Sequence, residues 1–209
     1  MLKIEAFNLL PSFMTNTWLL WNDQSLDALL IDPAAPDREL IDFIKTRGLK
    51  VHAIVNTHGH GDHIGGNPYF KAAFDCPIMI HEADAKMLTD NKKNLSEYMG
   101  TPLPPTPADR LLKDQDTIEM GKDKIRVIHT PGHTPGGICL LIEKYLISGD
   151  TLFEQSIGRT DFPGGSHEDI ITAIREKLFT LPEDTVVFPG HGPRTSIGLE
   201  KQNNPFVRI

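Results

Sequence analysis

The chain has 209 residues, of which 39% are hydrophobic and 23% are charged, the composition of an ordinary globular protein. Its formal net charge of −7 disfavours a nucleic-acid partner, because phosphates require clustered Lys and Arg. No apolar run approaches the ~18 residues of a membrane helix, and the N-terminus lacks a signal-peptide pattern. We therefore expect a single domain over residues 1–209, a cytoplasmic location and no membrane partner.

Short strands and helices alternate in the first half of the chain. Strands are predicted, from their aromatic and aliphatic content, at 3–7, 15–21, 26–31, 51–55 and 78–80. Helices are predicted, from their apolar faces, at 36–47, 67–74 and 82–88. The stretch 89–107 differs, because its four prolines indicate a long irregular connection. Such loops are often functional, so both a flap over a site and a surface excursion are compatible with it.

The second half of the chain likewise consists of short predicted strands with a helix. Strands are predicted at 110–112, 117–120, 125–129, 138–142, 145–148 and 185–188. A helix is predicted at 167–178, with Ser166 as its N-cap. Two strand-rich halves that each carry helices indicate two packed sheets with helices outside, an α+β fold.

Four side chains that can bind a metal, His58, His60, Asp62 and His63, follow directly after the predicted strand 51–55. Each would need its own hydrogen-bond partner in a core, so packing explains so dense a cluster poorly. Imidazole and carboxylate groups are instead common ligands of zinc and iron. Four nearby glycines make a helix improbable here, and we expect these ligands on a loop.

Three later apolar strands also end in turns that contain glycine and carry His133, Asp150 or His191. Neighbouring strand ends can meet on one side of a fold, where loops carry the chemistry and sheets hold them rigid. With the first cluster, this makes seven candidate ligands. Seven are too many for one tetrahedral ion and enough for two ions that share a carboxylate.

The first cluster resembles the HxHxDH signature of the metallo-β-lactamase superfamily, and the motifs around the three later candidates resemble its other motifs in the same order. Within the superfamily the chain looks most similar to glyoxalase II (hydroxyacylglutathione hydrolase), in particular to its short bacterial relatives. The stretches 152–162 and 204–206 carry that closer similarity. The resemblance implies a four-layer αββα sandwich with metals at one edge.

The resemblance also implies how the ligands are shared. It assigns the first ion to His58, His60 and His133, the second to Asp62, His63 and His191, and a bridging position to Asp150. Two divalent ions per chain are expected, zinc in the first place, with iron or manganese as alternatives.

Two adjacent ions can lower the pKa of a shared water, so the expected nucleophile is a bridging hydroxide. A thioester suits such a site, because its thiolate leaving group needs little acid catalysis. We expect hydrolysis of S-lactoylglutathione or a related S-acyl thioester, with Asp62 as the candidate for orienting the hydroxide. Arg159 is the candidate for binding a substrate carboxylate; the alternative is that it pairs with Asp161 or Glu154.

Full-length glyoxalase II carries a C-terminal helical region that binds glutathione, whereas only about eighteen residues follow His191 here. We therefore expect no such region, and the thiol carrier stays open, as does the choice between a monomer and a small homo-oligomer. The rival functions are a persulfide dioxygenase with one iron and a lactonase or β-lactamase.

The remaining histidines, His52, His81, His129 and His167, are interpreted as surface or hydrogen-bonded residues, with His129 as a candidate partner for a ligand. The two cysteines, at positions 76 and 139, are interpreted as small core residues.

Overall fold

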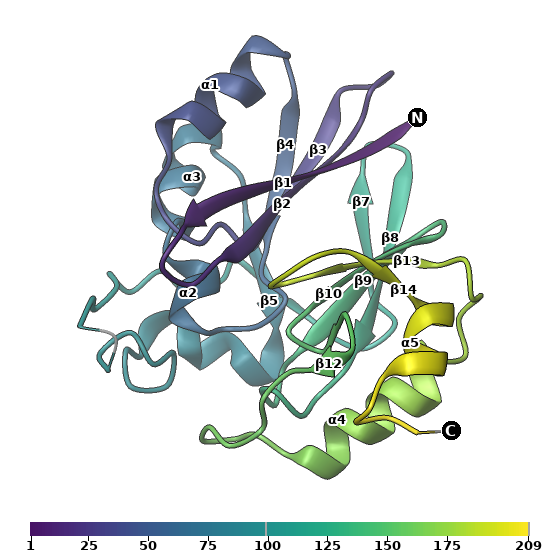
Figure 1. Ribbon diagram of the computed structural model, residues 1–209. Coiled ribbons are helices and arrows are strands. Elements are labelled where there is room, and N and C mark those ends of the chain that lie inside the picture. The colour runs from purple at the N-terminus through teal and green to yellow at the C-terminus, as the bar shows by residue number, and fades with distance from the viewer. Residues whose placement is uncertain (99, 209) are drawn as a thin grey trace.

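Two six-stranded β-sheets lie face to face, and helices cover the outer face of each (Figure 1). The computed structural model describes residues 1–98 and 100–208. The first sheet has the strand order β1-β2-β3-β4-β5-β6, and the second has the order β14-β13-β10-β9-β8-β7. The expected αββα sandwich of the α+β class is confirmed.

The first sheet contains β1 (Leu2–Leu10), β2 (Thr15–Asn22), β3 (Asp27–Ile31), β4 (Lys50–Val55), β5 (Ile78–His81) and β6 (Arg110–Leu112). Its first three strands form an antiparallel meander, and β3 to β6 then run parallel. Parallel strands of this kind are covered on both faces, which explains why β3 and β4 carry continuous aliphatic runs.

The second sheet contains β7 (Thr117–Met120), β8 (Asp123–His129), β9 (Ile138–Ile142), β10 (Tyr145–Gly149), β13 (Val186–Pro189) and β14 (Thr195–Ser196). It is antiparallel except where β10 pairs with β13 in parallel. A small hairpin of β11 (Leu152–Phe153) and β12 (Ser156–Ile157) follows β10.

The helices are α1 (Arg38–Thr46), α2 (Gly61–Ile64), α3 (Asn67–Phe74), the 3-10 helix η1 (Glu82–Thr89), α4 (His167–Ala173), its π-helical continuation η2 (Ile174–Leu178) and α5 (Ile197–Asn203). Ser166 caps α4 as predicted, because its hydroxyl accepts a hydrogen bond from the Asp169 amide. Among the described residues, no helix has both the length and the apolar character of a membrane span.

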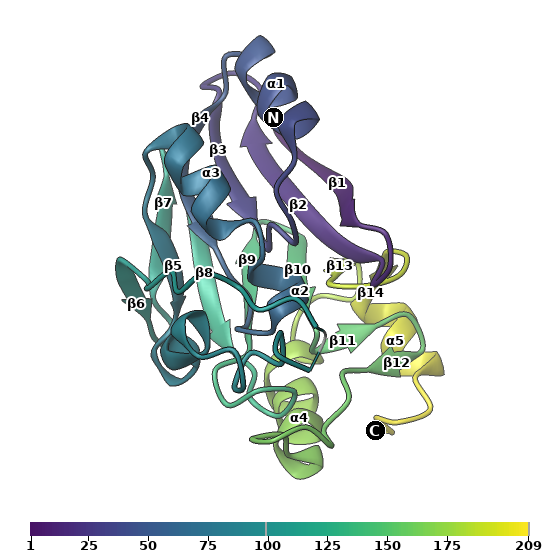
Figure 2. The ribbon, with the colours of Figure 1, turned by 90° about the vertical axis from the view of Figure 1, so that its left-hand side faces the viewer.

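Three hydrophobic clusters fill the spaces between the four layers. One lies between the sheets, where Trp18 of β2 meets Phe188 of β13 edge to face, with ring centres 5.1 Å apart. A second joins the first sheet to α1 and α3, and a third joins the other sheet to α4, η2 and α5. Figure 2 shows α1 and α3 on the outer face of the first sheet.

The predicted strands and helices are present with small shifts at their ends, but one expectation about the ligand cluster is wrong. Asp62 and His63 lie on the short helix α2 rather than on a loop. Glycine is tolerated at the start of this helix because Gly61 donates its N–H to the Asn94 carbonyl, a tertiary contact. The short elements β11, β12, β14 and the helix α5 were not predicted.

The helix α4 packs directly on the turn before His133. A Cβ on Gly132 would collide with Ile170, whose side chain is fully buried in the third cluster. The fold therefore places the end of this helix against a candidate ligand.

Ile170→Ala is expected to lower the free energy of unfolding by about 2–5 kcal/mol, because it leaves a cavity in this cluster. The neighbouring Ile171→Ala, at a partly buried position of the same helix, is expected to cost clearly less. Urea denaturation of the two variants checks this, and equal losses would contradict the packing described.

Candidate metal centre

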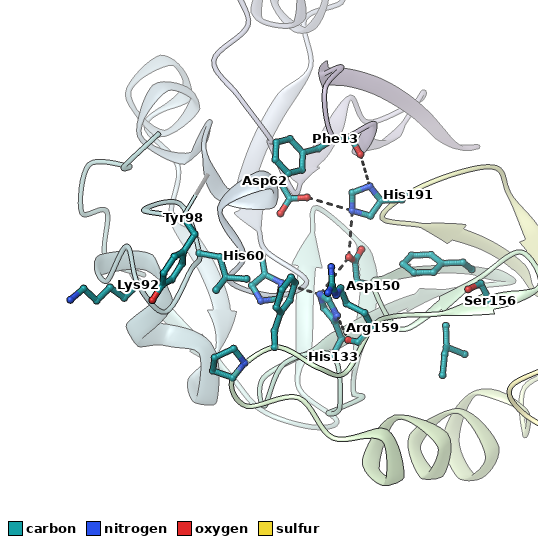
Figure 3. Close-up of a pocket in the computed structure, with 15 residues that line it drawn as sticks. Phe13, His60, Asp62, Lys92, Tyr98, His133, Asp150, Ser156, Arg159 and His191 are labelled. Atoms are coloured by element: carbon teal, nitrogen blue, oxygen red, sulfur yellow. Dashed lines mark hydrogen bonds and ion pairs between the residues drawn. The ribbon is translucent and has the colours of Figure 1, made fainter. Parts of the chain in front are cut away.

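The candidate ligands meet at one edge of the sandwich, although they come from four separate segments of the chain. His58 and His60 follow β4, while His133, Asp150 and His191 follow strands of the second sheet. Figure 3 shows His60, His133, Asp150 and His191 pointing toward a common centre. The convergence predicted from strand ends is therefore what the fold produces.

The first group consists of His58, His60 and His133, all buried, with one nitrogen of each within 4.8 Å of the others. His60 Nδ1 and His133 Nε2 lie 2.9 Å apart. His133 donates from Nδ1 to the Arg159 carbonyl at 2.7 Å, which turns its Nε2 toward the other rings of the group. His58 Nε2 is buried and has no hydrogen-bond partner among the described residues.

The second group consists of Asp62, His63 and His191, again with ligand atoms within 4.8 Å. The two ring Nε2 atoms lie 3.2 Å apart. His63 donates from Nδ1 to Asp32 at 3.0 Å, and His191 donates from Nδ1 to the Phe13 carbonyl at 3.1 Å. Both rings are thus held from outside, with their second nitrogens turned inward.

Asp150 lies between the two groups. Its Oδ1 is 3.5 Å from His63 Nε2, and its Oδ2 is 3.5 Å from His133 Nε2 and 3.4 Å from His191 Nε2. Oδ1 is buried without a hydrogen-bond partner in the described part of the chain. Only glycine fits at position 190, since a Cβ there would collide with this carboxylate.

These atoms fit metal ions. Two nitrogens on one tetrahedral zinc, with bonds of about 2.0–2.1 Å, lie roughly 3.3 Å apart, close to the observed spacings. The buried, unpartnered atoms of His58 and Asp150 also lack any other explanation, because such groups normally find a hydrogen bond.

Charges differ between the two groups. Burial and the nearby His133 lower the pKa of His60 to about 3, so this ring is neutral, the form that binds metals. Burial opposes protonation of His63 and His191 as well, but Asp150 and Asp62 raise the pKa of His63 to about 9 and that of His191 to about 10. Asp62 of the second group and Asp150 between the groups therefore attract positive charge strongly.

Sequence reasoning missed two buried carboxylates, Asp32 and Asp84. Asp32 accepts hydrogen bonds from the Thr57 amide at 2.7 Å, from the Thr57 hydroxyl at 2.6 Å and from His63. It also lies within ligand distance of His58 and His63, but both its oxygens are already engaged, so we interpret it as a support for His63. The available signal was its position, directly after β3 at the same edge as the ligands.

A cavity of about 730 Å³ opens onto both ligand groups. Its walls are mostly apolar and include Phe13, Leu95, Phe153, Ile157, Phe162 and Pro163. Part of one wall belongs to the irregular stretch 89–107. Asn94 holds that stretch in place, because its carbonyl accepts from Gly61 at 2.7 Å and its side chain donates to the Met87 carbonyl at 2.9 Å. Lys92, Leu95 and Tyr98 line the pocket, whereas most of 100–107 is exposed, so the first part of the stretch forms a wall of the site and the second part runs over the surface.

Arg159 also lines this cavity, but its charge is already paired. It donates two hydrogen bonds to Asp161, at 2.7 and 2.6 Å, and its guanidinium lies 3.9 Å from the centre of the Phe162 ring. The alternative of pairing with Asp161 therefore describes the structure, while the guanidinium remains at the pocket wall.

Three of the four histidines outside the cluster have partners of their own, and the fourth, His167, is exposed at the start of α4. His52 pairs with Asp27 at 2.6 Å, and His81 stacks on His129 with ring centres 4.0 Å apart. The His129 ring donates to the Pro135 carbonyl at 2.9 Å, so it supports the turn that carries His133 rather than that ring itself.

The fold and this cluster of His and Asp residues define a metal-dependent hydrolase. Residues 10–191 match the metallo-beta-lactamase superfamily, and the chain belongs to that family.

The similarity to known proteins extends over nearly the whole length of this chain. It is 37% identical to the probable metallo-hydrolase YqgX of Bacillus subtilis, with 92% of both chains covered. It is 34% identical to the hydroxyacylglutathione hydrolase GloC of Haemophilus influenzae, with 94% of both covered.

Solved structures show the same similarity. The B3 metallo-beta-lactamase BLEG-1 has a TM-score of 0.93 and 37% identity, covering 99% of this chain and all of its own. A di-iron-bound form of TTHA1623 has a TM-score of 0.85 and 32% identity, covering 97% of this chain and all of its own.

Asp32→Asn is expected to lower the free energy of unfolding by about 1–3 kcal/mol, because an amide cannot accept all three hydrogen bonds. It is also expected to weaken metal binding by about 10–100-fold through the loosened His63 ring. Asp27→Asn, at the opposite end of β3, is the control and is expected to leave metal affinity unchanged. Unfolding curves measure the stability and metal titrations measure the affinity. Normal metal affinity in a folded Asp32→Asn protein would contradict the role of Asp32 as a support for His63.

Proposed function

We propose that this protein hydrolyses thioesters, namely S-lactoylglutathione or a related S-acyl thiol, with two divalent ions in its metal centre. The observation that carries the proposal is the large pocket that ends on both ligand groups. The similarity to GloC, a hydroxyacylglutathione hydrolase, over 94% of both chains supports the thioester as substrate.

The proposed ligands are the seven residues whose imidazole or carboxylate atoms face the common centre. His58, His60 and His133 would hold one ion, Asp62, His63 and His191 the other, and Asp150 both. When bound, such a pair of ions activates a water molecule and polarises the substrate carbonyl. Zinc is our first choice, and iron or manganese would suit the same nitrogen and oxygen atoms.

The chain supplies no cysteine nucleophile among the described residues. Cys76 and Cys139 are both buried and lie outside the pocket. Burial raises the pKa of each thiol to about 11, so both stay protonated and unreactive near neutral pH. A water nucleophile is consistent with this.

In this proposal Asp62 orients the attacking water through a hydrogen bond. Its Oδ2 accepts a hydrogen bond from the Thr15 hydroxyl at 3.1 Å and lies 3.5 Å from His191 Nε2. The carboxylate therefore has a fixed direction at the floor of the pocket, where it can accept a hydrogen bond from the attacking water. The thiolate leaving group has a conjugate acid of pKa ~8.5 and departs without a strong acid.

The thiol carrier and acyl group would lie along the apolar walls of the pocket. Arg159 is our proposed contact for a carboxylate of the carrier, and such a carboxylate would have to share or replace Asp161. Contact with Phe162 holds the guanidinium of Arg159 at the pocket wall. The side chain therefore loses little conformational freedom when a substrate carboxylate replaces Asp161.

A second candidate is hydrolysis of a cyclic acyl compound, a lactone or β-lactam. The similarity to the BLEG-1 B3 metallo-beta-lactamase, at 37% identity over the whole chain, favours it. The same activated water would attack a ring carbonyl. A chromogenic β-lactam and a simple lactone, assayed beside thioesters, rank the two candidates by kcat/KM.

Purified protein with two metal ions per chain is expected to hydrolyse S-lactoylglutathione in anaerobic buffer. A panel with the same acyl group on different thiols then identifies the carrier from the kcat/KM values. The rival dioxygenase predicts one iron per chain and oxygen uptake with glutathione persulfide. That result, without thioester hydrolysis, would overturn the proposal.

Asp150→Asn is expected to weaken the binding of both ions, because the residue faces both ligand groups. The loss should exceed the about 10–100-fold typical of a residue that only supports a ligand. Metal analysis after dialysis measures it, with the exposed Asp169→Asn on α4 as the control. Full metal content in Asp150→Asn would show that it is no bridge.

A further inference from the structure

We propose that Asp84 is a positioning residue that fixes the separation of the two chain segments carrying the first ligand group. One segment carries His58 and His60, and the other carries His133. The inference rests on the proposed function, since it takes these three histidines as the ligands of one ion. Asp84 itself would not touch the ion.

The carboxylate of Asp84 joins the two segments directly. Its Oδ2 accepts from the Gly59 amide at 3.1 Å and from the Thr134 hydroxyl at 2.7 Å. Its Oδ1 accepts from the Gly136 amide at 2.7 Å. Gly59 lies between the two histidines of the first segment, and Thr134 follows His133, so the hydrogen bonds reach the immediate neighbours of all three rings.

The helix η1, which carries Asp84, also packs closely against the backbone of both segments. A Cβ on Gly59 would meet the side chain of Met87, and a Cβ on Gly136 would meet Asp84 itself. Both glycines are therefore needed for this close approach, which makes η1 a rigid support for the two segments.

A carboxylate suits this place because it has acceptor sites for all three donors. Asp84 is fully buried, so each donor that lost it would be left without a partner and without water. An asparagine offers one acceptor oxygen and would turn N–H groups toward the remaining donors. The expected consequence is that the segments move apart at the first ligand group.

The second ligand group depends on other supports. His63 is held by Asp32, and His191 is held by the Phe13 carbonyl. Asp84 makes no hydrogen bond to a residue of that group in the described chain. Loss of Asp84 should consequently affect the two metal-binding steps unequally, which a general loss of stability would not do.

Two kinds of variant test the proposal. Asp84→Asn changes the carboxylate, and Thr134→Val removes only one hydroxyl that donates to it, at nearly constant volume. Thr134→Ser keeps the hydroxyl and should restore binding. Glu82→Gln is the control, because Glu82 lies on the same helix but is exposed, and within residues 1–98 and 100–208 its one ion pair is with Lys113.

The measurement is titration of the metal-free protein with zinc against a competing chelator, repeated with cobalt to follow its absorption spectrum. His133→Ala and His191→Ala identify which binding step belongs to which group. For Asp84→Asn and Thr134→Val we expect the first-group step to weaken by about 10–100-fold, with the second-group step within about threefold of wild type. Thr134→Ser and Glu82→Gln should bind like the wild type.

Wild-type affinity at both steps in Thr134→Val would overturn the proposal, and so would equal weakening of both steps. This variant decides the matter even where Asp84→Asn does not fold. If His133→Ala alters neither metal-binding step, the proposed ligands are wrong, and the inference is overturned with them.

Discussion

The constraint on which the rest of the structure depends is the burial of many titratable side chains at one edge of the sandwich. Histidines 58, 60, 63 and 133 are all shielded from water, and Asp150 is nearly so. Such groups are tolerated in a protein interior only when they are hydrogen-bonded or paired with opposite charge. The surrounding chain meets this requirement from the outside and leaves the inward-facing atoms available.

The outer supports are of two kinds, backbone carbonyls and buried carboxylates. The carbonyls of Arg159 and Phe13 accept from His133 and His191, while Asp32 accepts from His63. Each contact identifies the ring nitrogen that donates outward, and the other nitrogen of the same ring faces the centre. The direction of the inward nitrogen of these three rings is therefore a property of the fold around them.

The two sheets act together in this arrangement. Each ligand group combines residues that follow β4 of the first sheet with residues that follow strands of the second. The spacing within a group is thus set by how the sheets pack, and the contact of Trp18 with Phe188 belongs to that interface. The same edge opens into the apolar pocket.

The sequence by itself predicted the two packed sheets, the positions of most strands along the chain and the seven residues that meet at the edge. It could do so because the hydrophobic periodicity, the turn residues and the residues that follow each strand are local features of the sequence. It could not determine that Asp62 and His63 lie on a helix, because Gly61 is held by the distant Asn94.

Only the tertiary structure decided which buried carboxylates support the histidines and how Arg159 is paired. Asp32 and Asp84 look like ordinary polar residues in the sequence, at a strand end and within a short helix. Their roles come from donors 25 to 52 residues away in the chain. Such contacts exist only once the sheets have packed; the position of Asp32 directly after β3 places it at the ligand edge but does not identify its partners.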